Sequence, residues 1–427
     1  MLPTPASVRE RLAPSHAAVG IVLALALALG YAGAHQPKLT AVAVAAGVAL
    51  FLAAQRPVAL AVAAVPLTLV LRRLGLGGSV SVSDVVVATA ALLALPAVRS
   101  TQELRRARTG LRSPALYLAL LLPGLIAHPG GPAVLEWCHR LELTTGATLV
   151  GVWLVRENRH RLALRLLVVG CLIVAGSSIE FTLVHALHPA YPLGLHKNFA
   201  GAMLSIALLV LMAGNQLHEI PKRIRHPVEV IIALGLLATQ SRGAMLALAF
   251  GIVAWLVRSG RTSRVGGGTR VLAVAIAIGV LGFAGYSVNQ QVNDKLNSQT
   301  NSAGVRQRVE TYTRTVVWRS SPITGAGLRY YNTGEFGPLA QAPNNVVDNE
   351  LAESGDIGLA GFVLFQSGLM YALWRRGGVA TLGLAVVLAH LLHGMFDIYW
   401  GAGTVSLTFV IVGMSLATNK SSGVSEA

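Results

Sequence analysis

Long apolar runs recur along almost the whole sequence, and they constrain the fold more than any other feature. Several of them are long enough to cross a hydrocarbon layer of about 30 Å as a helix, and several others are short enough to be tilted, paired or re-entrant. A helix pairs its own backbone polar groups in lipid. The runs lie at roughly 16–34, 39–54, 57–71, 83–98, 114–128, 140–155, 162–183, 198–215, 227–239, 243–257, 271–288, 353–373, 379–393 and 401–417. The sequence therefore predicts an all-α, polytopic integral membrane protein with about 12–14 transmembrane helices.

The composition supports this class of protein. Hydrophobic residues make up 54% of the chain and charged residues only 12%, whereas soluble domains carry about 25% charged residues. The first run begins near His16, after Arg9 and Arg11, and weakly resembles a signal peptide. Because no clear small-residue cleavage site follows it, we interpret this run as a retained first helix.

The net charge of +16 comes mostly from Lys and Arg in short connections between the apolar runs. This placement disfavours a nucleic-acid partner and favours anionic membrane lipids. Most of the basic clusters share one side with both termini, and we assign that side to the cytoplasm of a multi-pass protein in the cytoplasmic (inner) membrane. These clusters are Arg105, Arg106, Arg108 and Arg112; Arg156, Arg159 and Arg161; Lys222, Arg223 and Arg225; residues 258–270; and Arg375 with Arg376. Arg72 and Arg73 fall outside and are the exception.

One long polar segment interrupts the apolar pattern. It occupies residues 289–352 and separates the predicted transmembrane helices of 1–288 from the last helices and the cytoplasmic tail of 353–427. On the same topology this segment is one large extracytoplasmic loop that contains short helices.

The sequence gives no sign of a metal site or a cofactor. Cys138 and Cys171 are interpreted as unpaired thiols, since no Cys/His spacing resembles a zinc site. The glycines at 266–268 lack the Lys-Ser/Thr of a phosphate-binding loop, which disfavours a nucleotide cofactor.

The polar segment contains an expected helix at 305–319 whose apolar side chains recur at helical spacing. They are Val305, Val309, Tyr312 and Val316. Arg306, Glu310 and Arg314 fall on the side turned away from this stripe and are interpreted as a solvated ion-pair ladder. Arg308 lies on the flank that we expect to face the membrane domain, where a partly desolvated guanidinium favours an anion.

Arg242 is a second candidate for anion binding. It follows a polar break at 239–241 within an otherwise apolar stretch. An ionisable residue at such a break is a functional candidate, and exposed helix-end N–H groups also favour anions. The alternative is that the Arg242 side chain extends to the membrane interface without binding a ligand.

Polar residues also open two of the apolar helices. Asn345, Asn349 and Glu353 recur at every fourth position, with Asp348 beside them, and helix capping is the alternative explanation. Lys197 and Asn198 open another helix, where Lys197 is placed to meet an anionic headgroup. His393 and Asp397 lie at a further helix end, and either is a candidate for the same site as these polar residues.

These residues suit one kind of chemistry. Two arginines can bind a pyrophosphate bidentately, and a nearby carboxylate or amide can orient an acceptor hydroxyl, while a carboxylate can also take its proton. Glycosyl transfer from a lipid-linked pyrophosphate sugar needs both functions and requires no external nucleotide or metal.

Four motifs, taken in order, resemble the O-antigen ligase and O-antigen polymerase superfamily over roughly residues 195–416. They are Thr239-Gln-Ser-Arg242-Gly-Ala, Arg308-Val-Glu-Thr-Tyr312, Pro322-Ile-Thr-Gly325-Ala-Gly327, and Asn345 to Glu353-Ser-Gly-Asp-Ile-Gly-Leu359. The resemblance implies a many-helix fold of the GT-C type with a large outer loop. It also implies transfer of a glycan from a polyprenyl-pyrophosphate carrier to lipid A core, a growing chain or protein.

By this resemblance Arg242 and Arg308 are the phosphate-binding arginines, Glu353 is the glutamate that follows the loop, and Asn198 opens its helix. The sequence departs from the family at Asn344-Asn345, where members usually have His-Asn and the His is the proposed base. Three explanations stay open. An acidic residue of the loop exit (Asp348, Glu350 or Glu353) serves as the base, the reaction depends on leaving-group stabilisation, or the activity differs.

The prediction is a metal-independent glycosyltransferase that uses a polyprenyl-pyrophosphate-linked glycan as donor and a glycan, glycolipid or protein as acceptor. Arg242 and Arg308, with Asn345, Asn198 and Lys197, are expected to bind substrate. Glu353, Asn344 and Asp348 are expected to act at the acceptor. The alternatives are a lipid-linked glycan transporter or flippase, and a catalytically silent homologue that acts as a partner protein.

Overall fold

The computed structural model describes residues 56–70, 81–185, 188–213, 215–259, 302–332 and 342–418. The chain divides into two compact units, Met1–Leu60 and Ala61–Ala427. Within the described ranges the regular secondary structure is helical, which confirms the predicted all-α polytopic membrane protein. Predicted runs 16–34, 39–54 and 271–288 lie outside the described residues. The runs 114–128 and 140–155 each cover parts of consecutive helices, and each of the other runs overlaps mainly one helix.

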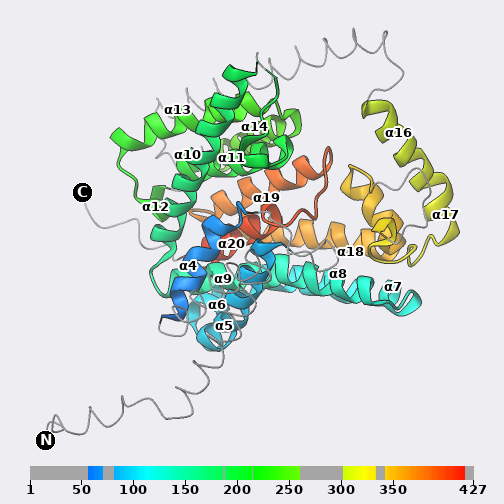
Figure 1. The fold of residues 1–427 in the computed structure, drawn as a ribbon. Coiled ribbons are helices and arrows are strands. Elements are labelled where there is room, and N and C mark those ends of the chain that lie inside the picture. Colours follow the sequence, from blue (N-terminus) through cyan, green and yellow to red (C-terminus); the bar gives the residue numbers. More distant parts are fainter. Residues whose placement is uncertain are drawn as a thin grey trace, which may run out of the picture. The chain divides into compact units, whose positions relative to one another are not determined.

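The helices of the first half of the chain are shown from blue to green in Figure 1. They are α4 (Pro57–Leu67), α5 (Val82–Val98), α6 (Gln102–Leu120), α7 (Leu122–Ala127), α8 (Gly131–Leu141), the π-helix η2 (Glu142–Gly146), α9 (Ala147–Arg156), α10 (His160–Val184), η3 (Pro192–Gly194), α11 (Lys197–Ala213), α12 (Asn215–His218), α13 (Lys222–Thr239) and α14 (Arg242–Ser259).

The second half contains the polar loop and the last long helices. Its described elements are α16 (Ser302–Tyr312), the π-helix η5 (Thr313–Val317), α17 (Trp318–Ser320), η6 (Tyr330–Asn332), α18 (Val346–Arg376), α19 (Ala380–Gly394) and α20 (Thr404–Ala417). Four helical stretches in the described residues are long and apolar enough to cross a membrane: Gln102–Ala127, α10, α14 and α18.

Helix α20 forms the centre of the packing, because it is apolar on all sides and every residue in it is buried. It packs against α9, α19 and α6, while α14 packs along α19 and α11. Close approach of α9 to α20 depends on small residues, since a Cβ on Gly151 would lie 2.1 Å from the carbonyl oxygen of Val410.

The polar loop is attached to α18 at a break in that helix. Gly355 has φ 62° and ψ −161°, a conformation open essentially to glycine alone. The segment 322–326 lies against the break and forms backbone hydrogen bonds with it, from Asp356 N to Pro322 O (2.8 Å) and from Ala326 N to Ala352 O (2.7 Å). The motif 322–327 thus pairs backbone groups that the broken helix leaves open.

Replacement of Gly355 by Ala is expected to destabilise the protein by about 2–5 kcal/mol, from backbone strain together with overpacking. The added Cβ would lie 2.6 Å from the Ile323 carbonyl and from Gly325 N. The midpoint of thermal unfolding of the purified, detergent-solubilised protein measures this effect. Gly176→Ala is the matched control, because a Cβ there meets nothing within 4 Å. Equal midpoints for the Gly355→Ala and Gly176→Ala proteins would contradict the conclusion that the break in α18 requires glycine at position 355.

Candidate functional site

A buried arginine on α8 connects the transmembrane helices to the polar loop. Arg140 is 0% exposed. Its guanidinium donates to Glu136 Oε1 (3.2 Å), to Glu350 Oε1 (2.9 Å) and to Glu353 Oε2, and it lies over the Trp400 ring at 4.7 Å from the ring centroid. Such a group of buried charges is tolerated only when each member is paired and hydrogen-bonded.

The carboxylates around Arg140 are satisfied by further donors. Glu350 accepts hydrogen bonds from the Tyr117 hydroxyl (3.0 Å), Trp400 Nε1 (2.7 Å) and the Ser354 hydroxyl (2.9 Å). The backbone N–H of Arg329 donates to Glu353 Oε1 (3.2 Å). We refer to Tyr117, Glu136, Arg140, Arg329, Glu350, Glu353 and Trp400 as the Arg140 network.

Most of the Arg140 network was missed in the sequence. Glu353 and Glu350 were considered there as candidate bases. Arg140 lay at the edge of an expected apolar run and was assigned no function. The available signal was the spacing of Glu136 and Arg140, four residues apart on one helix face just outside that run.

Asp348 and Asn345 both have structural contacts at the start of α18. Asp348 is fully buried, and its carboxylate accepts two hydrogen bonds from Arg314, at Nε (2.7 Å) and Nη2 (3.0 Å). These bonds raise the pKa of Arg314. Asn345 is the N-cap of α18, and its Oδ1 accepts from Val347 N (2.9 Å). Asn344 is half-buried in the bend just before it.

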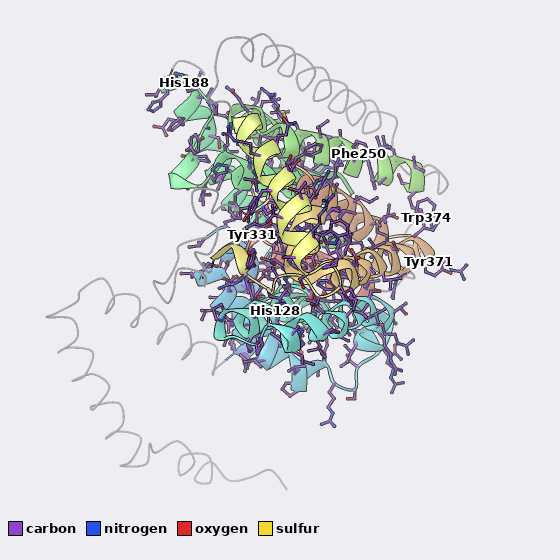
Figure 2. The ribbon with its side chains drawn as sticks, turned by 90° about the vertical axis from the view of Figure 1, so that its right-hand side faces the viewer. His128, His188, Phe250, Tyr331, Tyr371 and Trp374 are labelled. Atoms are coloured by element: carbon purple, nitrogen blue, oxygen red, sulfur yellow. The ribbon has the colours of Figure 1, made fainter. Side chains whose placement is uncertain are left out.

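The predicted apolar stripe of the loop helix is confirmed at Val309 but wrong at Val316. Val309 and Val317 are buried, whereas Val316 is 47% exposed. The π-helix η5 turns Val317 rather than Val316 inward, and the Thr313 hydroxyl bonds to that of Tyr331 (2.7 Å). Figure 2 shows Tyr331 beside the yellow α16–η5 helix.

The two loop arginines predicted to face solvent, Arg306 and Arg314, therefore contact the protein. Arg306 Nη1 donates to the carbonyl of Phe396 (3.2 Å) in the segment between α19 and α20. Arg308, which was expected to face the membrane domain, is exposed. The loop helix is therefore held both by these polar contacts and by packing of Val317 and Tyr312 against Tyr331 and Ala352.

A second set of basic residues lies where α11, α14 and α16 begin. Arg242 is half-buried at the first position of α14. Lys197 opens α11, and the positive charges of Arg242 and Arg306 act on it. We call Lys197, Arg242 and Arg306 the basic cluster. No carboxylate of the described residues forms an ion pair with any of the three.

Two polar neighbours border the basic cluster. The Ser241 hydroxyl, just before α14, donates to Asn198 Oδ1 (3.1 Å). His393 lies beside Gly243, since a Cβ added there would be 3.6 Å from His393 Cδ2. The structure thus places Lys197 and Asn198 near Arg242, whereas Glu353 and Asp348 form ion pairs elsewhere.

Substitution of Arg140 by Met is expected to destabilise the protein by about 3–5 kcal/mol, because it leaves buried carboxylates without their counter-charge. Thermal unfolding of the purified protein, together with its yield of monodisperse material, measures the loss. Arg319→Met removes an exposed arginine of α17 and serves as the control. An Arg140→Met protein as stable as the control would show that the network does not hold this region together.

Comparison with known protein families agrees with the resemblance drawn from the motifs. Residues 228–365 match the family model described as O-Antigen ligase. This stretch includes Arg242, Arg306, Arg308 and the start of α18, but neither Lys197 nor Arg140. No curated protein matches the sequence. The chain therefore carries, at residues 228–365, a domain of the O-antigen ligase superfamily.

Proposed function

We propose that this protein transfers a glycan from a polyprenyl-pyrophosphate carrier to a lipid, glycan or protein acceptor at the outer face of the cytoplasmic membrane. The O-antigen ligase domain supports a ligase- or polymerase-type glycosyltransferase in general. The finer assignment rests on one observation, which is the basic cluster without a carboxylate partner at the start of α14.

The basic cluster suits a diphosphate for two physical reasons. Two guanidinium groups and one ammonium group provide enough donors and positive charge for a dianionic leaving group. The N-terminus of α14, an 18-residue helix, adds backbone N–H groups and the positive end of the helix dipole. In this proposal Arg242, Arg306 and Lys197 bind the diphosphate and stabilise the charge that develops as the glycosidic bond breaks.

The acceptor side is assigned to the start of α18. We propose that Asn344 and Glu353 orient the acceptor hydroxyl and that Glu353 takes its proton, while Asn345 caps the helix. Asp348, first considered as a base, is assigned a positioning role, because both of its oxygens accept from Arg314. Arg308 is retained as a residue that contacts the donor from the exposed face of α16.

The transporter alternative has one observation in its favour. Glu353 and Asp348 are both held by arginines, so a protein that binds a lipid-linked pyrophosphate without breaking it would need no change in these contacts. Proteoliposomes that contain the purified protein and a lipid-linked glycan separate the two functions. Covalent transfer to an acceptor supports the enzyme, and movement of the intact donor between leaflets supports transport.

Replacement of Arg242 by Gln is expected to lower kcat/KM for glycan transfer by roughly 10²–10³-fold, as for loss of one donor to the charge of a transition state. Arg306→Gln should show a loss of similar size, and Arg308→Gln a smaller one. Transfer is measured with purified protein and lipid-linked donor, with Arg319→Gln as the exposed-arginine control. Full activity of Arg242→Gln in a folded protein would contradict the assignment.

A further inference from the structure

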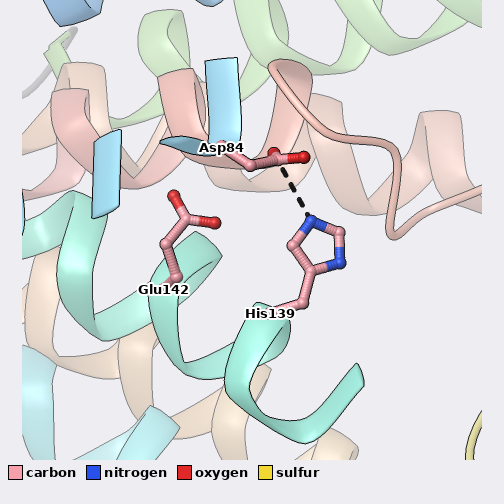
Figure 3. A group of neighbouring side chains, drawn as sticks. All are labelled: Asp84, His139 and Glu142. Atoms are coloured by element: carbon pink, nitrogen blue, oxygen red, sulfur yellow. Dashed lines mark ion pairs between the residues drawn. The ribbon is translucent and has the colours of Figure 1, made fainter. Parts of the chain in front are cut away.

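Three titratable side chains outside the basic cluster converge beside the Arg140 network. Asp84 lies in the first turn of α5, His139 in the last turn of α8, and Glu142 opens the π-helix η2. One ligand-type atom from each lies within 4.8 Å of the other two. Figure 3 shows the three side chains together, with Asp84 on α5 paired with His139 on α8.

The donor atoms of this group lack the hydrogen bonds that buried polar atoms usually make. Asp84 is 5% exposed; its Oδ2 accepts from Ser81 N (2.8 Å), whereas its Oδ1 has no hydrogen-bond partner in the described ranges. The same is true of both ring nitrogens of His139 and both carboxylate oxygens of Glu142. Asp84 forms an ion pair with His139, whereas no ion pair of Glu142 occurs in the described residues. A buried carboxylate without such a partner is destabilising unless a cation or a proton joins it.

Each ring nitrogen of His139 faces a carboxylate. Asp84 Oδ1 lies 3.4 Å from His139 Nε2, and Glu136 Oε2 lies 3.7 Å from His139 Nδ1 on the other side of the ring. A carboxylate near the second ring nitrogen is the usual outer-shell partner of a ligating histidine, and here it leaves Nε2 facing Asp84 Oδ1, another of the three candidate ligands. Glu136 is itself fixed by Arg140 and Arg329.

We propose that Asp84, His139 and Glu142 bind a divalent cation of the class that accepts one imidazole nitrogen and carboxylate oxygens, such as Zn²⁺. Three protein ligands leave a further coordination position open. The cation neutralises two buried carboxylates and links α5 to the α8–η2 helix. The π-helix that begins at Glu142 is of a kind found frequently at functional sites. This proposal does not depend on the transfer reaction.

The test measures cation binding by the full-length, chelator-treated protein in detergent. Calorimetric titration with Zn²⁺ and the visible absorption of added Co²⁺ both report the number of sites and their affinity. The wild type is expected to bind at least one equivalent with Co²⁺ absorption typical of nitrogen and oxygen ligands. The Glu142→Gln and His139→Gln proteins should each bind one equivalent of cation fewer than the wild type. Where binding persists, its affinity should fall by more than the roughly 10–100-fold that loss of an outer-shell partner costs.

The control is Glu180→Gln, which removes an exposed carboxylate of α10 and should keep the wild-type stoichiometry. Two ligand variants are used because a substitution at Asp84 also removes the capping box of α5, and thermal unfolding confirms that each variant is folded. Absence of a saturable site in the wild type, or wild-type binding in either folded ligand variant, overturns the proposal.

Discussion

The structure depends on one buried guanidinium that holds three carboxylates from two parts of the chain. Arg140 stands on α8, and it binds Glu136 on its own helix and Glu350 and Glu353 on α18. Because the transfer of each charge out of water costs several kcal/mol unless it is paired, these elements are stable only together. The same network includes Trp400, so it also fixes the segment that leads into α20.

The same segment also contacts a residue of the basic cluster. Phe396 lies in the same connection between α19 and α20, and its carbonyl receives Arg306 from the loop helix. The arginines fall into two classes, according to whether a carboxylate forms an ion pair with them. Arg140 and Arg314 are neutralised by carboxylates and hold elements in place, whereas Arg242 and Arg306 have no described acidic partner. Unpaired, half-buried positive charge is the physical reason for assigning an anionic ligand to the second class.

The sequence predicted the helices well because membrane burial imposes long apolar runs, and α18 begins close to the expected place. The side-chain environments were harder to predict. Arg306 and Arg308 differ by two positions on one helix, and the apolar stripe did not predict that Arg306 contacts Phe396 while Arg308 is exposed, because Asp348 and Tyr331, which contact that helix, are remote in sequence. Asp84 and His139 meet only through packing of α5 on the α8–η2 helix, so no local spacing of metal ligands was visible.

We propose that the basic cluster recognises a diphosphate, and equilibrium binding of the carrier lipid is the decisive experiment. Polyprenyl pyrophosphate and polyprenyl monophosphate are titrated into the solubilised protein under the same salt conditions. Tighter binding of the pyrophosphate is expected, and this preference should be lost in Lys197→Gln and Arg242→Gln proteins that remain folded. Equal affinity for both lipids in the wild type, or a preference unchanged in the two variants, would contradict it.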